Sequence, residues 1–295
     1  MNAGNYVYTA SVKGSVSDEL VNTYLMRPAA GVLVGFLYRT PVTPNQVTVA
    51  AMIAGLVAAI LYAQGSPLWT AVAGILISCK DLLDSADGQL ARAKGAFSRA
   101  GRFLDSLGDI TVNFAACAAI AWAFLQGGAG FWVVPAWGAA FLFVSLRVSY
   151  HVYYQTSFLH LNNAYTGNRT SEELRGEDLS AGRGTLALQR VFLVLYGWQD
   201  RLVARLDNWS REGIGGGTET GRRWYGDVTG VRWSGFIGLG TELLLLTLCS
   251  VINHLNLYLY LNLIGMNAVW ASCIAYRRVV LRRRLRAVIV PGRPS

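Results

Sequence analysis

The sequence has few charged residues. Asp, Glu, Lys and Arg make up only 15% of its 295 residues, where soluble domains average about 25%. Hydrophobic residues make up 53%, and the mean hydropathy is +0.34. This composition excludes an ordinary soluble domain and predicts an integral membrane protein.

Cysteine and histidine are also scarce, with four and three residues. The cysteines, none of them in a CxxC pair, are Cys79, Cys117, Cys249 and Cys273. Each lies in an apolar segment, so we interpret them as small buried hydrophobes and exclude disulfides and metal-thiolate sites. The N-terminus lacks a continuous apolar run, so we expect no signal peptide.

No segment resembles a nucleic-acid-binding module, so the net charge of +9 needs another origin. Basic residues that flank membrane helices on the cytoplasmic side supply one.

A membrane helix needs about 20 mostly apolar residues. On this criterion we predict six spans: Val47–Gln64, Leu68–Leu90, Phe103–Leu125, Phe131–Tyr150, Trp233–Ile252 and Leu257–Arg277.

Lys and Arg are distributed asymmetrically between the predicted loops. The short linkers at 65–67, 126–130 and 253–256 contain neither residue, whereas the loops on the opposite side are basic. The positive-inside rule therefore predicts that both termini face the cytoplasm. The fold class is then an all-α integral membrane protein, divided into an N-terminal cytoplasmic or interfacial segment (1–46), spans one to four (47–150), a cytoplasmic amphipathic connection (151–232), spans five and six (233–278) and a basic cytoplasmic tail (279–295).

Two segments are amphipathic, but neither contains an apolar run long enough to span a membrane. From Ser15, whose spacing to Asp18 resembles a helix start, to Arg39 we predict an interfacial helix, interrupted by Pro28. Leu186–Trp209 is similar, and it either lies on the membrane or packs on a neighbouring helix or subunit.

Five aspartates lie inside or beside predicted spans two and three. On the second span, Asp84, Asp87, Gly88, Ala91 and Arg92 share one helical face, and on the third Gly101, Asp105 and Asp109 do the same. A short turn joins the two helices, which we therefore expect to be antiparallel. Asp84 lies eight residues before Arg92 and Asp109 eight residues after Gly101, or about 12 Å along each axis. Four carboxylates are thus predicted at one level near the cytoplasmic boundary.

Four clustered carboxylates cannot all be ionised without a compensating cation. A ligand set made only of oxygen suits Mg²⁺ or Mn²⁺, and the absence of His and Cys argues against zinc. Gly88, Ala91 and Gly101 let a ligand approach the backbone, and Arg92 offers a forked cation suited to phosphate. Together these groups favour phosphoryl transfer.

The pattern D-x2-D-G-x2-A-R-x8-G-x3-D-x3-D, from Asp84 to Asp109, resembles the signature of the CDP-alcohol phosphotransferase family, also called CDP-alcohol phosphatidyltransferases. The resemblance implies transfer of a substituted phosphoryl group from a CDP-alcohol to a hydroxyl acceptor, with release of CMP. It implies that Asp84, Asp87, Asp105 and Asp109 hold Mg²⁺ or Mn²⁺, often as two ions, and that Asp109 is the base. A homodimer is implied on the same ground.

The resemblance also implies a nucleotide site. Gly88, Ala91 and Arg92 would form it together with Gly101. The stretch TPNQVT (43–48) resembles the family's Pro-Asn element, which places Asn45 and Thr48 near the nucleotide.

Several other polar residues lie inside or at the ends of spans. Asp81 either supports the metal site or pairs with Lys80 or another basic group. Arg147, His151 and Glu242 are candidates for acceptor binding, although a helix-end role near lipid headgroups also suits the first two. Asn262 and Asn267 are expected to form hydrogen bonds between helices.

Three functions remain open. The first is phospholipid synthesis from a CDP-diacylglycerol-like donor and a small polar acceptor such as inositol phosphate, glycerol phosphate, inositol or serine. The second is the same chemistry with a soluble CDP-headgroup donor, carrying choline, ethanolamine or inositol, and a lipid or polyol acceptor. The third is metal or ion transport by intramembrane carboxylates, which does not explain Gly88, Ala91 and Arg92.

Overall fold

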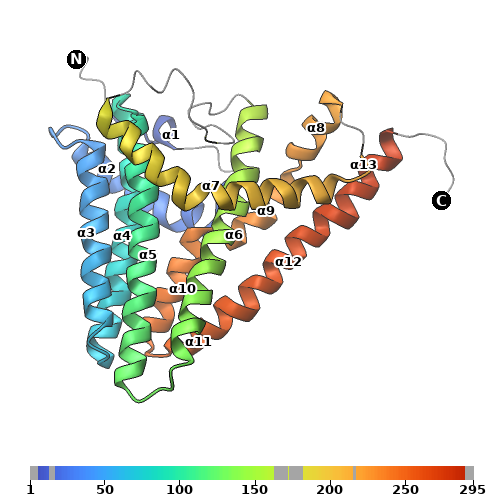
Figure 1. The fold of residues 1–295 in the computed structure, drawn as a ribbon. Coiled ribbons are helices and arrows are strands. Elements are labelled where there is room, and N and C mark those ends of the chain that lie inside the picture. Colours follow the sequence, from blue (N-terminus) through green and yellow to red (C-terminus); the bar gives the residue numbers. More distant parts are fainter. Residues whose placement is uncertain (1–5, 13–16, 163–171, 173–181, 215–216, 290–295) are drawn as a thin grey trace.

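The computed structural model describes residues 6–12, 17–162, 172, 182–214 and 217–289. Every regular element in these residues is helical, which confirms the all-α fold class (Figure 1). In chain order the elements are α1 (Tyr8–Ser11), the π-helical turn η2 (Asn22–Met26), α2 (Arg27–Leu37), α3 (Pro44–Tyr62), α4 (Pro67–Lys94), α5 (Arg99–Gln126), α6 (Val133–Leu161), α7 (Arg183–Arg211), α8 (Thr218–Tyr225), α9 (Val228–Ser234), the 3₁₀ turn η4 (Gly235–Ile237), α10 (Leu239–Val251), α11 (Leu255–Tyr260), the π-helical turn η5 (Leu261–Met266), α12 (Asn267–Ala275), the π-helical turn η6 (Tyr276–Leu281) and α13 (Arg282–Ile289).

Five helical stretches of the described chain are long and apolar enough to cross a membrane: Pro44–Tyr62, Arg99–Gln126, Val133–Leu161, Val228–Val251 and Leu255–Ala287. Helix α4 has 28 residues and is also long enough, but Lys80, Asp81 and Asp84 interrupt its apolar part. A sixth crossing therefore stays a prediction. It is consistent with Figure 1, where α4 runs beside α3 over the same length.

The buried core lies among α3, α4, α5, α6 and α10, and includes Tyr62, Ile77, Ile120 and Trp137. Close approach of the helices depends on small residues. A Cβ atom at Gly55 would lie 2.5 Å from the side chain of Val112, and one at Gly74 would lie 2.5 Å from that of Ser250. Glycine at these positions lets α3 pack on α5 and α4 pack on α10.

Most helices extend beyond the predicted spans. Helices α4 and α5 include the motif residues that lie outside the apolar windows, and α6 continues to Leu161, eleven residues past the predicted end. Predicted span five is instead two helices, α9 and α10, separated by η4 between Gly235 and Gly238. The apolar window marks only the part of a helix that lipid would cover, so hydropathy underestimates helix length here.

The N-terminal segment differs from the prediction at Pro28. Residues 20–37 form one continuous helical run, in which the π-helical turn η2 immediately precedes Pro28. A widened turn accommodates proline, which lacks the N–H that an α-helix would use. Ser15 lies outside the described residues, and the continuous helical run begins at Leu20.

Two carboxylates that precede this run have partners in other elements. Asp18 pairs with Arg27 of α2 at 2.6 Å, and Glu19 accepts hydrogen bonds from the backbone N–H groups at the start of α10.

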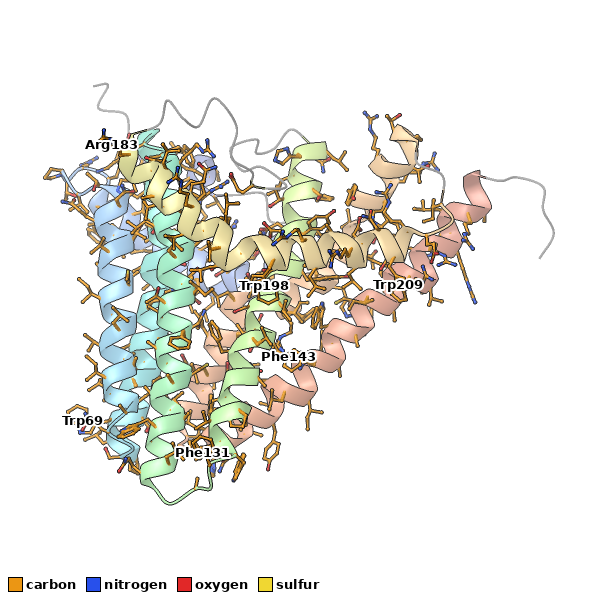
Figure 2. The ribbon with its side chains drawn as sticks, viewed as in Figure 1. Trp69, Phe131, Phe143, Arg183, Trp198 and Trp209 are labelled. Carbon is orange, nitrogen blue, oxygen red and sulfur yellow. The ribbon has the colours of Figure 1, made fainter. Side chains whose placement is uncertain are left out.

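Helix α7 contains the amphipathic segment predicted at Leu186–Trp209 and lies across one end of the helical bundle (Figure 1). In Figure 2, Trp69 and Phe131 lie at the opposite end of the bundle from Arg183 of α7, and Trp198 and Trp209 lie between these two levels. One face of α7 carries exposed apolar side chains: Val191, Val194, Trp198, Leu202 and Trp209. Most of the polar stretch 162–184 and residues 215–216 of the Gly-rich stretch lie outside the described residues.

Candidate active site

A tight turn brings the two motif-bearing helices together. Helix α4 ends at Gly95, which has a φ of 61°, a left-handed conformation that glycine adopts without strain. Three residues later the Ser98 side chain caps α5 by accepting a hydrogen bond from the N–H of Gly101 at 2.9 Å. The chain therefore reverses, and α4 and α5 run antiparallel, each packed against α3 (Figure 1).

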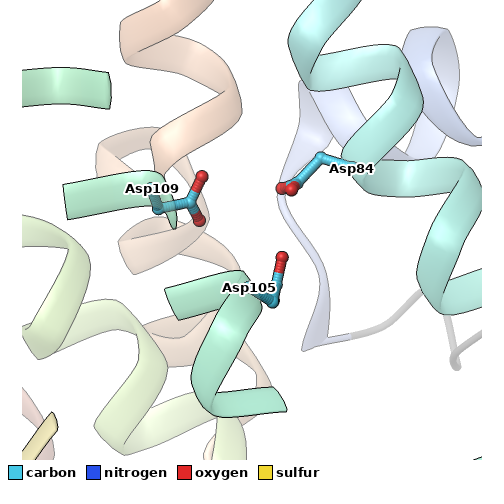
Figure 3. Close-up of side chains that lie close together, drawn as sticks. All are labelled: Asp84, Asp105 and Asp109. Carbon is cyan, nitrogen blue, oxygen red and sulfur yellow. The ribbon is translucent and has the colours of Figure 1, made fainter. Parts of the chain in front are cut away.

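Three of the motif aspartates converge across this pair of helices. The carboxylates of Asp84 on α4 and of Asp105 and Asp109 on α5 each contribute an oxygen that lies within 4.8 Å of the other two. Figure 3 shows the three side chains pointing toward one shared space. Asp84 and Asp109 are about one-fifth exposed, so the cluster is half-buried and accessible.

Lys80 supplies a positive charge to this cluster. Its buried side chain reaches along α4, and its Nζ donates a hydrogen bond to Asp109 Oδ1 and lies 3.6 Å from Asp84 Oδ2. From the sequence, Lys80 was expected only as a partner for Asp81. Among the described ion pairs Lys80 instead binds Asp84 and Asp109, and Asp81 is buried with one carboxylate oxygen that accepts no hydrogen bond from the described residues.

Asp87, the fourth motif aspartate, is buried one turn beyond Asp84 and lies outside the tight cluster of three. The hydroxyl of Thr48 donates a hydrogen bond to Asp87 Oδ2 at 2.5 Å. Thr48 lies near the start of α3, where Thr43 and Gln46 form a capping box and Pro44 occupies the first turn. The stretch TPNQVT is therefore the N-terminus of α3, and it brings Thr48 to Asp87, the second aspartate of the motif.

The remaining residues of the predicted nucleotide site lie at the same end of α4 and α5. A Cβ atom at Gly101 would lie 2.6 Å from Asn45 Oδ1, so the absence of a side chain at Gly101 makes room for Asn45. The guanidinium of Arg92 lies beside Gly88, 3.5 Å from where a Cβ would be, and its Nε donates a hydrogen bond to the carbonyl of Ser11. Ala91 is half-buried between them.

A cavity of about 270 Å³ adjoins the aspartate cluster on the side of α5, α6 and α7. Asp105 and Asp109 form part of its wall, so the cavity ends at the cluster. Other polar side chains that line it include Arg102, Asn113, Gln155, Thr156, Glu172, Tyr196 and Asp200. Sequence reasoning assigned no role to any of these seven. The signal that could have found two of them is spacing: Tyr196 and Asp200 follow Phe192 at intervals of four residues along one face of α7.

Two acidic residues and one arginine set the charge at the α7 side of the cavity. Glu172 pairs with Arg102 and with Arg99. Burial is the main cause that raises the pKa of Asp200 to about 6, and the nearby Glu172 carboxylate adds to it. The positive charge of Arg102 lowers the pKa and so opposes both effects. Asp200 is therefore still mostly ionised at pH 7. Tyr196 donates a hydrogen bond from its hydroxyl to the carbonyl of Ser106 at 2.8 Å, which fastens α7 to α5.

The three predicted acceptor residues do not line this cavity. Arg147 is fully buried and pairs with Glu242 at 2.5 Å, and it also donates to Asn267 Oδ1 at 2.6 Å. Asn262 donates to Glu242 Oε2 at 3.1 Å. This network links α6, α10 and the last long helix, as expected for the two asparagines, and its burial excludes a headgroup position for Arg147. His151 is buried and lies 3.0 Å from the hydroxyl of Ser234.

The aspartate cluster fits a divalent cation. All of its candidate ligand atoms are carboxylate oxygens, which suit Mg²⁺ and Mn²⁺. Asp105 Oδ1 is buried and accepts no hydrogen bond from any described residue, and a buried carboxylate oxygen without a donor is costly unless a cation binds it. The negative charge of the cluster, which would attract a cation, also attracts the Lys80 ammonium to two of the three carboxylates.

Helices of membrane-spanning length and aspartates that face one another from two antiparallel helices fit a membrane protein with a site for a divalent cation. Residues 41–204 match the sequence model of the CDP-alcohol phosphatidyltransferase family. The match covers more than half of the chain, including α3 to α6 and most of α7. The chain belongs to this family.

Curated relatives share part of this region. The chain is 34% identical over 148 residues to the bifunctional IPC transferase and DIPP synthase of Aquifex aeolicus, an alignment that covers 50% of this chain and 32% of that protein. It is 34% identical over 148 residues to the archaetidylinositol phosphate synthase of Pyrococcus horikoshii, covering 50% of this chain and 61% of that protein. It is 32% identical over 117 residues to the phosphatidylinositol phosphate synthase of Mycobacteroides abscessus, covering 39% and 48%. The alignments thus span less than two thirds of each relative.

Proposed function

We propose that this protein transfers a substituted phosphoryl group, in particular a phosphatidyl group from a donor such as CDP-diacylglycerol, to the hydroxyl of a small polar acceptor, and releases CMP. The observation that carries the proposal is the convergence of Asp84, Asp105 and Asp109 within 4.8 Å on two facing helices. Family membership and the synthase or transferase names of the three relatives support phosphoryl transfer over the ion-transport alternative.

In this proposal Asp84, Asp105 and Asp109, with Asp87 beside them, hold one or two Mg²⁺ or Mn²⁺ ions. When bound, the metal neutralises charge on the diphosphate of the donor and on the departing CMP. Thr48 fixes the orientation of the Asp87 carboxylate through its hydrogen bond. Lys80 balances part of the negative charge from inside α4.

The donor nucleotide is proposed to bind where α3, α4 and α5 meet. The small residues Gly88, Ala91 and Gly101 line this region, where Asn45 lies against Gly101 and the Arg92 guanidinium lies beside Gly88. The guanidinium of Arg92 can bind a phosphate oxygen through two parallel N–H donors. These contacts would fix the diphosphate next to the aspartates and orient it for attack in line with the bond to CMP.

Asp109 is proposed as the general base because it belongs both to the cluster and to the wall of the cavity. It would take the proton from the acceptor hydroxyl while the hydroxyl oxygen forms a bond to the phosphorus that carries the alcohol group. The bond from that phosphorus to the bridging oxygen breaks, and CMP leaves with the electron pair. The proton ends on the Asp109 carboxylate.

The cavity supports a small acceptor. Its volume of about 270 Å³ lies below the range of roughly 300–1,000 Å³ typical of sites for drug-sized ligands. This size favours a donor that carries the lipid over the alternative in which a lipid is the acceptor. The basic loops support a cytoplasmic position of the site and of both termini, and a homodimer remains a prediction from the family resemblance.

The proposal is tested by CMP release from purified protein in detergent micelles. CDP-diacylglycerol is compared with CDP-choline, CDP-ethanolamine and CDP-inositol, each with a panel of acceptors and with Mg²⁺, Mn²⁺ or a chelator. We expect release from the lipid donor only with a divalent ion, and a loss of about 100-fold or more in Asp109→Asn. Glu219→Gln, which removes an exposed carboxylate on α8, is the matched control. Equal CMP release by Asp109→Asn and wild type would refute the base assignment, and no release from any CDP-alcohol would refute the function.

A further inference from the structure

The cavity beside Asp105 and Asp109 has walls formed by one face of each of three helices. Its α5 wall includes Arg102, Asp105, Asp109 and Asn113, and its α7 wall consists of Phe192, Tyr196 and Asp200. These positions recur at helical spacing, so each wall is the continuous face of one helix. The cavity is therefore a built part of the fold, and its position next to the general base makes it the proposed place of the acceptor.

The charge on these walls is predominantly negative. Four carboxylates line the cavity, those of Asp105, Asp109, Glu172 and Asp200, against the single described guanidinium of Arg102. Metal binding would compensate the first two. Arg102 is already paired with Glu172, and its guanidinium also lies 4.8 Å from the centre of the Phe103 ring. An anionic group on the acceptor would have to displace Glu172 from Arg102 and would then lie near Asp200.

Three lining side chains have hydrogen-bonding capacity that the described residues leave unused. Asp200 on α7, Asn113 on α5 and Thr156 on α6 line the cavity, and among the described residues none has a side-chain hydrogen bond or ion pair. Asp200 can only accept when it is ionised, so its complement is an O–H or N–H donor. A phosphate near pH 7 has chiefly acceptor oxygens and carries negative charge, which makes it a poor match.

We propose that the acceptor is a small hydroxyl compound without a phosphate group, and that Asp200 selects it by accepting hydrogen bonds from its O–H or N–H donors. The inference rests on the proposed function, because it names the substrate class of that same site. It separates this chain from relatives whose names specify an inositol phosphate product. Asp200 is then a specificity-determining residue that lies outside the signature motif.

The chemical balance of the reaction is unchanged. A hydroxyl of the acceptor forms the new bond to phosphorus, CMP leaves with the electron pair of the broken bond, and Asp109 receives the proton. The groups that bind Asp200 lie elsewhere on the acceptor and do not react. Asp200 therefore acts on binding, and we expect its effect mainly on the KM for the acceptor.

The experiment measures kcat/KM with matched acceptor pairs, using the CDP-lipid donor and the divalent ion that give CMP release. The pairs are inositol with inositol phosphate and glycerol with glycerol phosphate, and serine is added as an amino-bearing acceptor. We expect the phosphate-free member of each pair to be used at least 10-fold better. In Asp200→Asn we expect this preference to fall about 10- to 100-fold, as for loss of a hydrogen bond to a charged group, with the KM for the donor unchanged.

Glu219→Gln controls for the loss of one negative charge outside the cavity, and it should keep the wild-type preference. The wild-type panel is decisive without any variant, so poor folding of Asp200→Asn would not obscure the result. Equal or better use of inositol phosphate and glycerol phosphate by the wild type would overturn the inference while the proposed function stands. A preference that survives in Asp200→Asn would overturn the assignment to Asp200. Absence of CMP release with every acceptor would overturn both proposals.

Discussion

Replacement of Lys80 by Met tests how the aspartate cluster is stabilised. The Lys80 side chain is only 3% exposed, and its Nζ lies 3.6 Å from Asp84 Oδ2 and donates to Asp109. Methionine has a similar length but no charge. The variant therefore leaves three converging carboxylates without their internal cation, and we expect it to destabilise the metal-free protein.

The size of the effect follows from the contacts. At 3.6 Å and an effective dielectric constant of about 20, one pair of unit charges attracts by about 5 kcal/mol. Burial of the ammonium offsets part of this attraction, and removal of one partner from a buried ion pair costs about 3–5 kcal/mol in measured cases. With roughly 2 °C of Tm per kcal/mol for a chain of this size, the metal-free variant should melt about 6–10 °C below the wild type.

The assay is thermal unfolding in detergent, followed by circular dichroism with a chelator and again with saturating Mg²⁺ or Mn²⁺. A bound ion supplies the missing positive charge, so the difference in Tm between the variant and the wild type should shrink by at least half. Lys94→Met is the matched control. Lys94 is the last residue of α4, and its Nζ donates to the carbonyls of Thr40 and Val42 and binds no carboxylate in the described contacts. A difference in Tm for Lys80→Met that is the same with and without the ion would refute the reasoning.

Three further predictions concern other contacts. Gly101→Ala should displace Asn45, whose Oδ1 would lie 2.6 Å from the new Cβ, and raise the KM for the CDP-alcohol about 10- to 100-fold; an unchanged donor KM would contradict a nucleotide contact by Asn45. Burial raises the pKa of Glu19 to about 8 from an ordinary 4.5. The folded protein therefore keeps the Glu19 proton at pH values where the unfolded chain has lost it. This contribution to stability is complete below about pH 4.5 and falls as pH rises toward 8, by up to about 1.4 kcal/mol per pH unit. Tm measured from pH 5 to 9 should therefore fall less in Glu19→Gln than in the wild type, and equal slopes would contradict the assignment. Arg147→Met should lower stability by about 3–5 kcal/mol in denaturant unfolding, and the double variant Arg147→Met, Glu242→Leu should recover most of it; no recovery would show that the ion pair is not the cause.

The arrangement of the aspartates could be predicted because it depends on short-range geometry. Asp84 and Asp109 lie on helices joined by a turn of a few residues, so helical spacing alone places them on facing surfaces. The hydrogen bond between Thr48 and Asp87 joins residues 39 positions apart, and only the resemblance to the family element suggested that these two residues are neighbours. The long helices themselves followed from their apolar content.

Other features depend on contacts that spacing does not encode. Arg147 and Glu242 are 95 residues apart, and nothing in the local sequence indicates that the buried arginine neutralises that carboxylate. To predict the cavity wall on α7, one must know how the connecting helix α7 folds back over α5. Hydropathy does not carry this information. Predicted helix ends were wrong at α6 for a related reason, because the polar residues beyond Tyr150 continue the helix without continuing the apolar pattern.

Helix α7 has two faces with different neighbours, and this links the acceptor cavity to the surroundings of the protein. Phe192, Tyr196 and Asp200 face the cavity, while the exposed stripe that includes Val194 and Trp198 lies on a different side of the same helix. A rigid helix transmits a shift of one face to the other. Lipid packed against this stripe would thus act on one wall of the cavity and, through the hydrogen bond from Tyr196 to the Ser106 carbonyl, on the α5 arm of the aspartate hairpin. The bilayer would then act as a regulator of acceptor affinity, and lipid composition should change the KM for the acceptor.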